Sequence, residues 1–365
     1  MRVLLCGAGS AGHVNPAIAI GETIKKNLPK SKIAYVATVS GIENDLVDFE
    51  KFHIDVRGIK RKLSLSNVKS IYLTLTAIRE SKRIINEFCP DIVVGTGGYA
   101  TFPVAYAAHK LGVTVALHES NAIPGKAIKM LEKYADVIFT NFKESEQYFK
   151  HKEKLCHVGN PLRSGFDKSV KTELKPTNSK QVILCYGGSL GSETLNNAAL
   201  DVADNLIRYR DNIVFILATG KRNYYEVCKK IKERRIDTIK NFIVYEYIYD
   251  MASVMANADI VISRAGAITI SELARQGKAA ILIPSPNVTD DQQTKNAKAL
   301  ADIGGACMIR ESELVDGRIC ASVASLLGDE ERRKDMEKAI SGFAPDNCNK
   351  LIYDELVRLV ENKNK

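Results

Sequence analysis

The sequence predicts an α/β protein with two domains, each built on a parallel β-sheet. Strand-like apolar segments alternate with helix-like segments along almost the whole chain, which is typical of parallel α/β architecture. The 365 residues exceed what one ordinary core accommodates. Each half also begins with an apolar strand, a glycine-rich turn and a helix. This repeat indicates two Rossmann-like domains facing each other, with ligands bound where the carboxyl ends of their strands converge.

The first half contains an ordered series of alternating segments. Strands are predicted over 2–7, 32–38, 53–58, 91–97, 113–119, 136–140 and 154–159. Helices are predicted to begin near Pro16, Glu43, Ser66, Thr101, Gly125 and Lys143. A polar segment without apolar periodicity, 160–180, follows and is the best candidate for a linker.

The second half restarts the alternation after this linker. Strands are predicted over 181–186, 212–220, 241–247, 258–266 and 278–286. Residues 348–363 read as one amphipathic helix. We therefore expect an N-terminal domain over 1–163 and a C-terminal domain over 164–345, with a helix over about 346–365 packing back on the N-terminal domain.

Composition restricts the class of protein and its partners. The net charge of +9 suits an anionic partner such as a phosphorylated ligand, an acidic membrane surface or a nucleic acid. No apolar run reaches the roughly 18 residues of a membrane span, and residues 1–7 do not resemble a secretory signal, so we expect a cytoplasmic protein. The eight cysteines include no C-x-x-C pair, which argues against a zinc site or a disulfide framework.

The basic charge is concentrated over residues 57–83, which carry eight basic side chains and one acid, Glu80. Apolar residues recur there at helical spacing, among them Tyr72, Leu75 and Ile78. One interpretation is a core-facing helix with a solvated basic rim. The other is a cationic, partly apolar face that lies on an anionic membrane.

The first glycine turn, Gly7-x-Gly9-x-x-Gly12, has the spacing of a dinucleotide-binding fingerprint. A dinucleotide site also requires an acidic residue at the end of the second strand, but 38–40 are neutral and Glu43 comes late. The turn still offers backbone amides at a helix N-terminus, which suit a phosphate. His13 follows directly and is a candidate general base, although a lone histidine is often structural.

Further polar clusters follow other strands. A second glycine turn spans 95–103, and His118, Glu119 and Asn121 follow the next strand, where a hydrogen-bonded loop is the alternative to a binding role. A third glycine turn, 187–196, suits another phosphate.

Glu272 could accept both hydroxyls of a ribose or simply complement its helix N-terminus. Since D-x-D and paired-histidine spacings are absent, we expect no metal and no cofactor.

Seven motifs in order resemble one glycosyltransferase family. They are "GAGSAGHVNP", "GTGGYATFP", "HESN", "GNPLR", "GGSLGS", "SRAGAITISELA" and "DDQQTKNA". Together they resemble the undecaprenyldiphospho-muramoylpentapeptide β-N-acetylglucosaminyltransferases, which are GT-B enzymes of family 28 with two Rossmann-like domains facing across a cleft. Ala8, Ser10, Ala11 and Ser120 depart from the residues frequent in this family, and Ser120 leaves the contact of that side chain in doubt.

The resemblance implies inverting transfer of N-acetylglucosamine from UDP-N-acetylglucosamine to the C4 hydroxyl of the undecaprenyl-linked muramoyl pentapeptide. The catalytic base would be His13. The implied substrate-binding residues are Ser10, Ala11, Gly12, Asn121, Arg163, Ser189, Ile248, Ala267, Ile268, Glu272, Gln292 and Gln293. The acceptor diphosphate would lie at loops containing Gly9, Gly97, Gly98 and Tyr99.

In this interpretation the N-terminal domain binds the acceptor and the C-terminal domain binds the UDP-sugar. The protein would be peripheral on the cytoplasmic face of the cell membrane, with no nucleic-acid partner. Alternatives are another GT-B enzyme, such as a lipid glycosyltransferase or a UDP-N-acetylglucosamine epimerase, an NAD-dependent oxidoreductase, and a catalytically silent sugar-nucleotide sensor.

Overall fold

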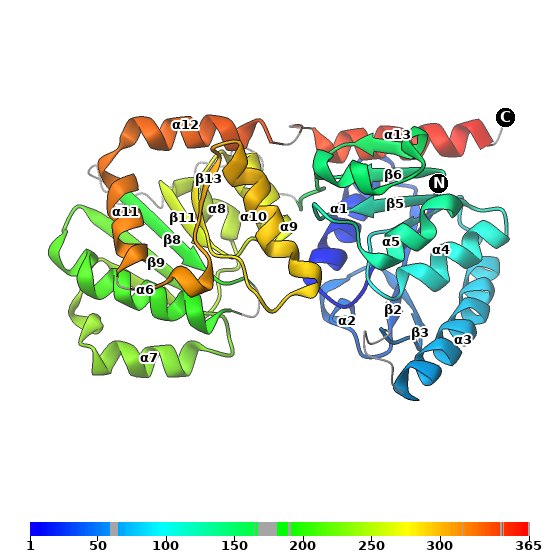
Figure 1. The fold of residues 1–365 in the computed structure, drawn as a ribbon. Helices are drawn as coiled ribbons and strands as arrows, with labels where there is room; N and C mark the ends of the chain where they lie inside the picture. The colour runs from blue at the N-terminus through cyan, green and yellow to red at the C-terminus, as the bar shows by residue number, and fades with distance from the viewer. Residues whose placement is uncertain are drawn as a thin grey trace. The chain divides into compact units, whose positions relative to one another are not determined.

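The computed structural model describes residues 1–58, 65–163, 165–166, 181–188, 191–315, 317–343, 345 and 347–363. The chain divides into two compact units. Unit 1 contains Met1–Arg163 and Pro345–Lys365, and unit 2 contains Ser164–Ala344. Each unit has its own sheet of parallel strands with helices between them (Figure 1), which confirms the predicted fold class.

Unit 1 contains a seven-stranded sheet with the order β3-β2-β1-β4-β5-β6-β7. Its strands are β1 (Arg2–Cys6), β2 (Lys32–Thr38), β3 (Glu50–Ile54), β4 (Ile92–Gly95), β5 (Thr114–Glu119), β6 (Val137–Thr140) and β7 (Leu155–His157). The order reverses between β1 and β4, whose carboxyl ends lie side by side. In open α/β sheets this reversal point is where ligands bind.

Helices cover both faces of this sheet. They are α1 (Ala11–Asn27), α2 (Glu43–Leu46), α3 (Leu65–Phe88), α4 (Thr101–Lys110), α5 (Lys126–Leu131) and α13 (Cys348–Lys363). Apolar residues of α3, α4 and α5 form the core on one face, and those of α1 and α13 form it on the other. Figure 1 shows α13, at the red end of the chain, beside the strands of unit 1. The two-layered core follows from strands that are apolar on both sides.

Unit 2 contains a six-stranded sheet with the order β10-β9-β8-β11-β12-β13. Its strands are β8 (Gln181–Tyr186), β9 (Ile213–Ala218), β10 (Phe242–Tyr245), β11 (Ile260–Ser263), β12 (Ala279–Leu282) and β13 (Ala306–Met308). Its helices are α6 (Glu193–Asn205), α7 (Tyr224–Glu233), α8 (Met251–Asn257), α9 (Ala267–Gln276), α10 (Gln292–Asp302), α11 (Arg318–Gly328) and α12 (Glu330–Ser341). Here the strand order reverses between β8 and β11.

Several boundaries differ from the sequence prediction. The helix expected near Pro16 begins at Ala11, because Ser10 has the extended backbone of an N-cap and the proline is accommodated inside the helix. The strand expected over 53–58 spans Glu50–Ile54 instead. This strand lies at the edge of the sheet, where exposed charged residues such as Glu50 are tolerated. Its sequence therefore shows only a weak alternation of apolar and polar residues. The short edge strand β13 was not predicted.

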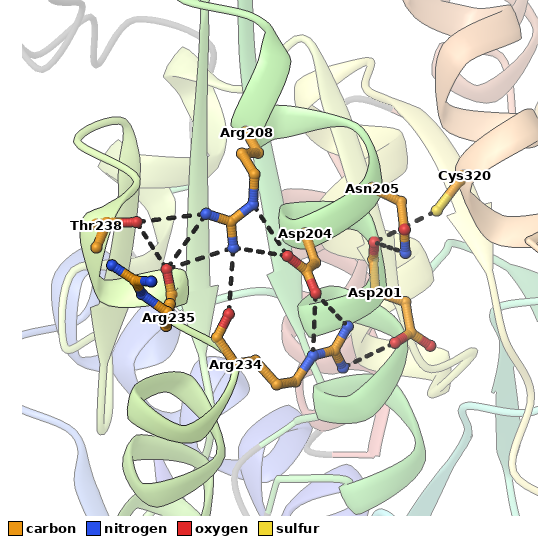
Figure 2. Close-up of polar contacts among 8 residues, drawn as sticks. All are labelled: Asp201, Asp204, Asn205, Arg208, Arg234, Arg235, Thr238 and Cys320. Carbon is orange, nitrogen blue, oxygen red and sulfur yellow. Dashed lines mark hydrogen bonds and ion pairs between the residues drawn. The ribbon is translucent and has the colours of Figure 1, made fainter.

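An ion-pair network joins α6 to the end of α7 in unit 2 (Figure 2). Asp204 accepts hydrogen bonds from Arg208 (Nη2, 2.6 Å) and Arg234 (Nη2, 3.2 Å), and Arg234 also contacts Asp201 at 2.8 Å. The hydrogen bond from Arg208, with the charges of both arginines, lowers the pKa of Asp204 below 3.8. The network therefore depends on an ionised Asp204.

Among the described residues, no helix is both long and apolar enough to cross a bilayer. The described part of α3 nevertheless exposes two large apolar side chains, Tyr72 and Leu75, which are 65% and 58% accessible. Ala77, Ser81 and Ile84 of the same helix are buried. The helix thus packs through one face while Tyr72 and Leu75 remain in solvent. The basic residues 60–62 lie outside the described residues.

Candidate functional site

The first two glycine turns of unit 1 pack against each other at the reversal point between β1 and β4. The Ala8 amide donates to the Gly97 carbonyl at 3.2 Å, and the Thr96 hydroxyl donates to the His13 carbonyl at 2.6 Å. Gly98 has a φ of +78°, and a Cβ there would lie 1.9 Å from the Ala8 carbonyl oxygen. Only glycine fits this approach of two backbones.

The other predicted residues of these turns lie in the same cluster. The ring of Tyr99 packs on Gly9, where a Cβ would lie 3.0 Å from the ring. Ser10 is the N-cap of α1, and Ala11 and Gly12 are its first two residues. The first amides of a helix have no acceptor within the helix and form its positive end. The cluster can therefore bind an anion through backbone groups.

His13 lies in the first turn of α1 beside this cluster. Its Nδ1 is 3.1 Å from the Ala8 carbonyl oxygen and 3.2 Å from the Ser10 hydroxyl. Since a carbonyl only accepts, this contact assigns the proton to Nδ1 and leaves the Nε2 lone pair unprotonated. Burial lowers the pKa of His13 below 6.5, and the bond to Ala8 opposes this in part. Near neutral pH the ring is a neutral base, and its Nε2 is close to the backbone of Gly97.

The "HESN" segment at the end of β5 forms a hydrogen-bonded loop. Glu119 is buried and accepts from the Asn121 amide (2.9 Å) and side chain (3.2 Å) and from the Gly125 amide (2.7 Å). Burial raises its pKa to about 7 against these bonds. His118 is fully buried with Nε2 3.1 Å from the Gly159 carbonyl, and burial lowers its pKa to about 4. Glu119 and His118 thus shape the loop that carries Asn121.

Arg163 does not lie in the glycine cluster. It pairs with Glu22, in the second half of α1, at 3.3 Å, and both side chains are partly exposed. The preceding residue, Leu162, is bonded through its amide and its carbonyl to the side chain of Asn349, which also donates to Thr23. The chain is therefore anchored to α1 and α13 where it leaves unit 1.

The third glycine turn, after β8, begins the site of unit 2. Ser189 lies outside the described residues. Ser192 caps α6 and accepts from Arg264 Nη2 at 2.7 Å. Arg264 is largely buried, forms an ion pair with Glu311 and donates to the Ile283 carbonyl at 3.1 Å. Its charge is thus held next to the N-terminus of α6.

Four predicted residues occupy the loop after β10 and the start of α9. Ile248 is buried in the loop between β10 and α8, while Ala267 and Ile268 are the first residues of α9. Glu272 lies one turn further along α9, partly buried, and burial raises its pKa to about 8. No described residue donates a hydrogen bond to its carboxyl group. The side chain therefore has unused acceptor capacity.

The two predicted glutamines begin α10 and differ in their contacts. Gln293 Oε1 accepts from the Ser285 amide at 2.9 Å and fastens the loop that follows β12. Gln292 has no hydrogen-bond partner among the described residues. Asp290 and Asp291, just before it, both have left-handed backbone, with φ of 57° and 52°. Such strain is frequent in binding loops, and here it sets the direction in which α10 begins.

In unit 1 the structure brings His13 together with Gly9, Ser10, Ala11, Gly12, Gly97, Gly98 and Tyr99. In unit 2 the described site residues lie in segments that follow β10, β11 and β12. Three further residues, Thr96, Thr101 and Asn296, bond to the backbone of these loops and were not predicted as site residues. The two threonines flank the glycines of "GTGGYATFP" and were visible in that motif. In the described part of the chain, no group of three His, Cys, Asp or Glu could hold a metal ion.

Comparison with known families agrees with this architecture. The model of the glycosyltransferase family 28 N-terminal domain matches residues 3–140, and that of the family 28 C-terminal domain matches residues 182–351. A crystal structure of MurG from Acinetobacter baumannii has a TM-score of 0.77 at 27% identity, covering 98% of this chain and 99% of that one. A UDP-GlcNAc 2-epimerase from Neisseria meningitidis, bound to UDP-GlcNAc, shares the fold, with a TM-score of 0.71 at 17% identity and coverage of 98% and 100%.

Curated relatives are similar over the full length. The UDP-N-acetylglucosamine–N-acetylmuramyl-(pentapeptide) pyrophosphoryl-undecaprenol N-acetylglucosamine transferase of Acetivibrio thermocellus is 37% identical over 372 residues, covering 100% of this chain and 99% of that protein. Because the similarity covers both proteins almost completely, it is not confined to one domain that two otherwise different proteins share. The chain belongs to glycosyltransferase family 28, among the N-acetylglucosamine transferases of this type.

Proposed function

We propose that this enzyme transfers N-acetylglucosamine from UDP-N-acetylglucosamine, with inversion, to the C4 hydroxyl of undecaprenyl-pyrophosphoryl-N-acetylmuramyl pentapeptide. The observation that carries the proposal is the full-length similarity to curated transferases whose names give this donor and this acceptor. The geometry of His13 adds support, because a neutral imidazole with an unprotonated Nε2 adjoins an anion-binding turn.

Unit 1 is proposed to bind the acceptor. Its diphosphate would contact the amides of the interlocked turns containing Gly9, Gly97 and Gly98, with Tyr99 packed beside them. Ser10, Ala11 and Gly12 would contribute the positive end of α1. Asn121 would contact substrate from the loop that Glu119 shapes, and Arg163 would reach it from the segment where the chain leaves unit 1.

Unit 2 is proposed to bind the donor. The uracil would bond to the backbone at Ile248, with Ala267 and Ile268 lining the site. Glu272 would accept both ribose hydroxyls, which suits a carboxyl without a described donor. Gln292, whose amide has no described partner, would bond to the sugar hydroxyls, assisted by Gln293. Ser189 would lie near the diphosphate.

In the chemical step the acceptor C4 oxygen attacks the anomeric carbon while His13 Nε2 takes its proton. The bond between the anomeric carbon and the diphosphate oxygen breaks, and UDP leaves with the electron pair. Negative charge develops on the diphosphate only as this bond breaks, so amides and positive helix ends that meet it stabilise the transition state more than the ground state.

A UDP-release assay tests the proposal. The full chain is incubated with UDP-N-acetylglucosamine and a short-chain analogue of the lipid-linked muramoyl pentapeptide, and in parallel with diacylglycerol. We expect UDP release only with the muramoyl acceptor. Release with diacylglycerol instead would indicate a lipid glycosyltransferase, and release independent of any acceptor would indicate an epimerase-like reaction.

We further propose that the enzyme works as a peripheral protein on an anionic membrane at its cytoplasmic face. The exposed Tyr72 and Leu75 of α3 support a membrane-facing role for the basic segment 57–83. We expect charge reversal of Lys60, Arg61 and Lys62 to weaken binding to phosphatidylglycerol vesicles in a sedimentation assay. Unchanged binding would assign these residues to a solvated rim.

A further inference from the structure

The Arg264 side chain joins several segments at the carboxyl edge of the unit 2 sheet. Arg264 itself follows β11, and its Nη2 donates to the Ser192 hydroxyl, after β8, at 2.7 Å. Its Nη1 donates to the Ile283 carbonyl, after β12, at 3.1 Å. Nη2 also forms an ion pair with Glu311, in the short 3-10 helix η7 (Glu311–Glu313) after β13. Because the sheet order reverses between β8 and β11, the guanidinium lies at the edge position where such sheets bind ligands.

This arginine retains hydrogen-bond donors that its protein partners do not use. The bonds to Ser192, Glu311 and Ile283 use both N–H groups of Nη2 and one N–H of Nη1. The Nε N–H and the other N–H of Nη1 have no acceptor among the residues that the structure describes. The Arg264 side chain is only 12% exposed, so water satisfies these groups poorly. A largely buried cation with unused donors beside the N-terminus of α6 suits a diphosphate, whose oxygens can accept from both.

Glu311 restricts the direction of this guanidinium. Its carboxylate contacts the same Nη2 that donates to Ser192, and 21% of the Glu311 side chain is exposed. A charge-assisted hydrogen bond between partly buried groups holds both side chains more firmly than an exposed ion pair does. Because the guanidinium is planar and rigid, fixing Nη2 and one N–H of Nη1 also fixes the directions of the remaining N–H groups. The bond to Glu311 therefore determines where the unused donors of Arg264 point.

We propose that Glu311 is a positioning residue of the donor site, holding Arg264 so that its remaining N–H groups meet the diphosphate of a uridine nucleotide. This inference rests on the proposed binding of the donor to unit 2. Glu311 would not touch the nucleotide. Its own negative charge repels a diphosphate, so its contribution to binding is the orientation of Arg264 and not attraction.

Calorimetric binding of UDP and uridine to the full chain tests this inference, with uridine measured by its competition with UDP. The ratio of the two affinities reports on contacts to the diphosphate. Glu311→Ala is expected to weaken UDP binding about three- to tenfold, as for loss of one hydrogen bond, and to leave uridine binding unchanged. Glu311→Gln keeps an acceptor oxygen for Nη2 and removes the repelling charge. It should therefore retain at least the wild-type preference for UDP.

Glu313→Gln is the matched control, because it neutralises the other carboxylate of η7. Glu313 accepts from the Arg310 amide at 2.9 Å and lies 3.9 Å from Arg318. Glu313→Gln should keep the wild-type preference for UDP when all variants are measured below their melting temperatures. An equal loss in Glu313→Gln and Glu311→Ala would overturn the inference, and so would an unchanged or larger preference in Glu311→Ala. A loss in Glu311→Gln as large as in Glu311→Ala would also overturn it, because the bond to Nη2 would then not be the cause.

Arg264→Met separates this inference from the proposed function. If the wild-type chain binds UDP no more tightly than uridine, the proposed donor site and the inference fail together. If wild type prefers UDP and Arg264→Met keeps the full preference, Arg264 does not bind the diphosphate and only the inference fails. Loss of the preference in Arg264→Met and Glu311→Ala, with retention in Glu311→Gln, supports the inference.

Discussion

The sharpest prediction concerns His13, since its contacts define which nitrogen is the base. His13→Ala removes a neutral imidazole whose Nδ1 is bonded to the Ala8 carbonyl at 3.1 Å and whose Nε2 is unprotonated. Loss of a general base lowers turnover by on the order of 10²–10⁴, which corresponds to about 3–5 kcal/mol in the barrier. Loss of the Nδ1 bond costs only about 1 kcal/mol of folding stability.

The UDP-release assay separates these two effects when kcat is measured below the melting temperature of each variant. His13→Asn is informative because its side-chain amide nitrogen, which like Nδ1 is attached to Cγ, can donate to Ala8 but is not basic. We expect His13→Asn to recover melting temperature without recovering kcat. His53→Ala is the control, because His53 is an exposed histidine of unit 1 that contacts Asn44.

The pH profile provides a second measurement on the same residue. Because burial lowers the pKa of His13, wild-type kcat/KM should hold as pH falls to 6.5 and decline only below it, as Nε2 becomes protonated. His13→Asn should lack this decline. Near-wild-type turnover in His13→Ala, or the same acidic decline in His13→Asn, would refute the assignment of the base.

Three further predictions concern stability. Gly98→Ala should lower the unfolding free energy by about 2–4 kcal/mol in urea titration, since its Cβ would meet the Ala8 carbonyl at 1.9 Å. Gly112→Ala, with positive φ but open space, should cost only about 1 kcal/mol, and equal costs would contradict the steric argument. Asp204→Asn should cost about 1–2 kcal/mol at pH 7. The pKa of Asp204 is lowered in the folded wild type, so its carboxylate loses its stabilising charge only as pH falls below 3.8. The deficit of Asp204→Asn should therefore vanish there in urea titrations. A deficit that stays constant with pH would show that the charge of Asp204 is not its cause. Glu272→Gln should gain in melting temperature over wild type as pH rises from 4.5 to about 8, because the raised pKa makes ionisation destabilising in the folded state. A pH-independent difference between the two melting curves would count against that pKa.

Much of the fold was predictable because the signals are local. The strand of residues 32–38 and the helix of 348–363 agree with their predicted bounds, since the strand is a continuous apolar run and the helix has apolar residues at helical spacing. The strand predicted over 53–58 was shifted, since an edge strand pairs on one side only and needs no complete apolar face. An element whose formation depends on a neighbouring strand shows little hydrophobic periodicity in its own sequence.

The candidate site likewise has a part that the sequence predicts and a part that it does not. Glycine turns after strands were visible, and parallel topology requires their carboxyl ends to lie at one edge. What sequence could not provide is the set of specific contacts: the Ala8 carbonyl that assigns the His13 proton, and the amides that bond Glu119 within its loop. Such contacts depend on the direction of each side chain, and a shift of about an ångström is enough to make or break them.

The position of α13 has a consequence for biosynthesis. Its Ile352 and Leu356 complete the core that α1 forms on one face of the unit 1 sheet, but they emerge from the ribosome only after all of unit 2. The first unit to be synthesised is therefore the last to be finished. Until α13 arrives, the apolar surface that it covers is open to solvent, while unit 2 already has every strand of its own sheet. During the translation of unit 2, the nascent chain therefore carries an incomplete N-terminal unit with exposed apolar surface that is prone to aggregation. A chaperone would be of most use in this interval.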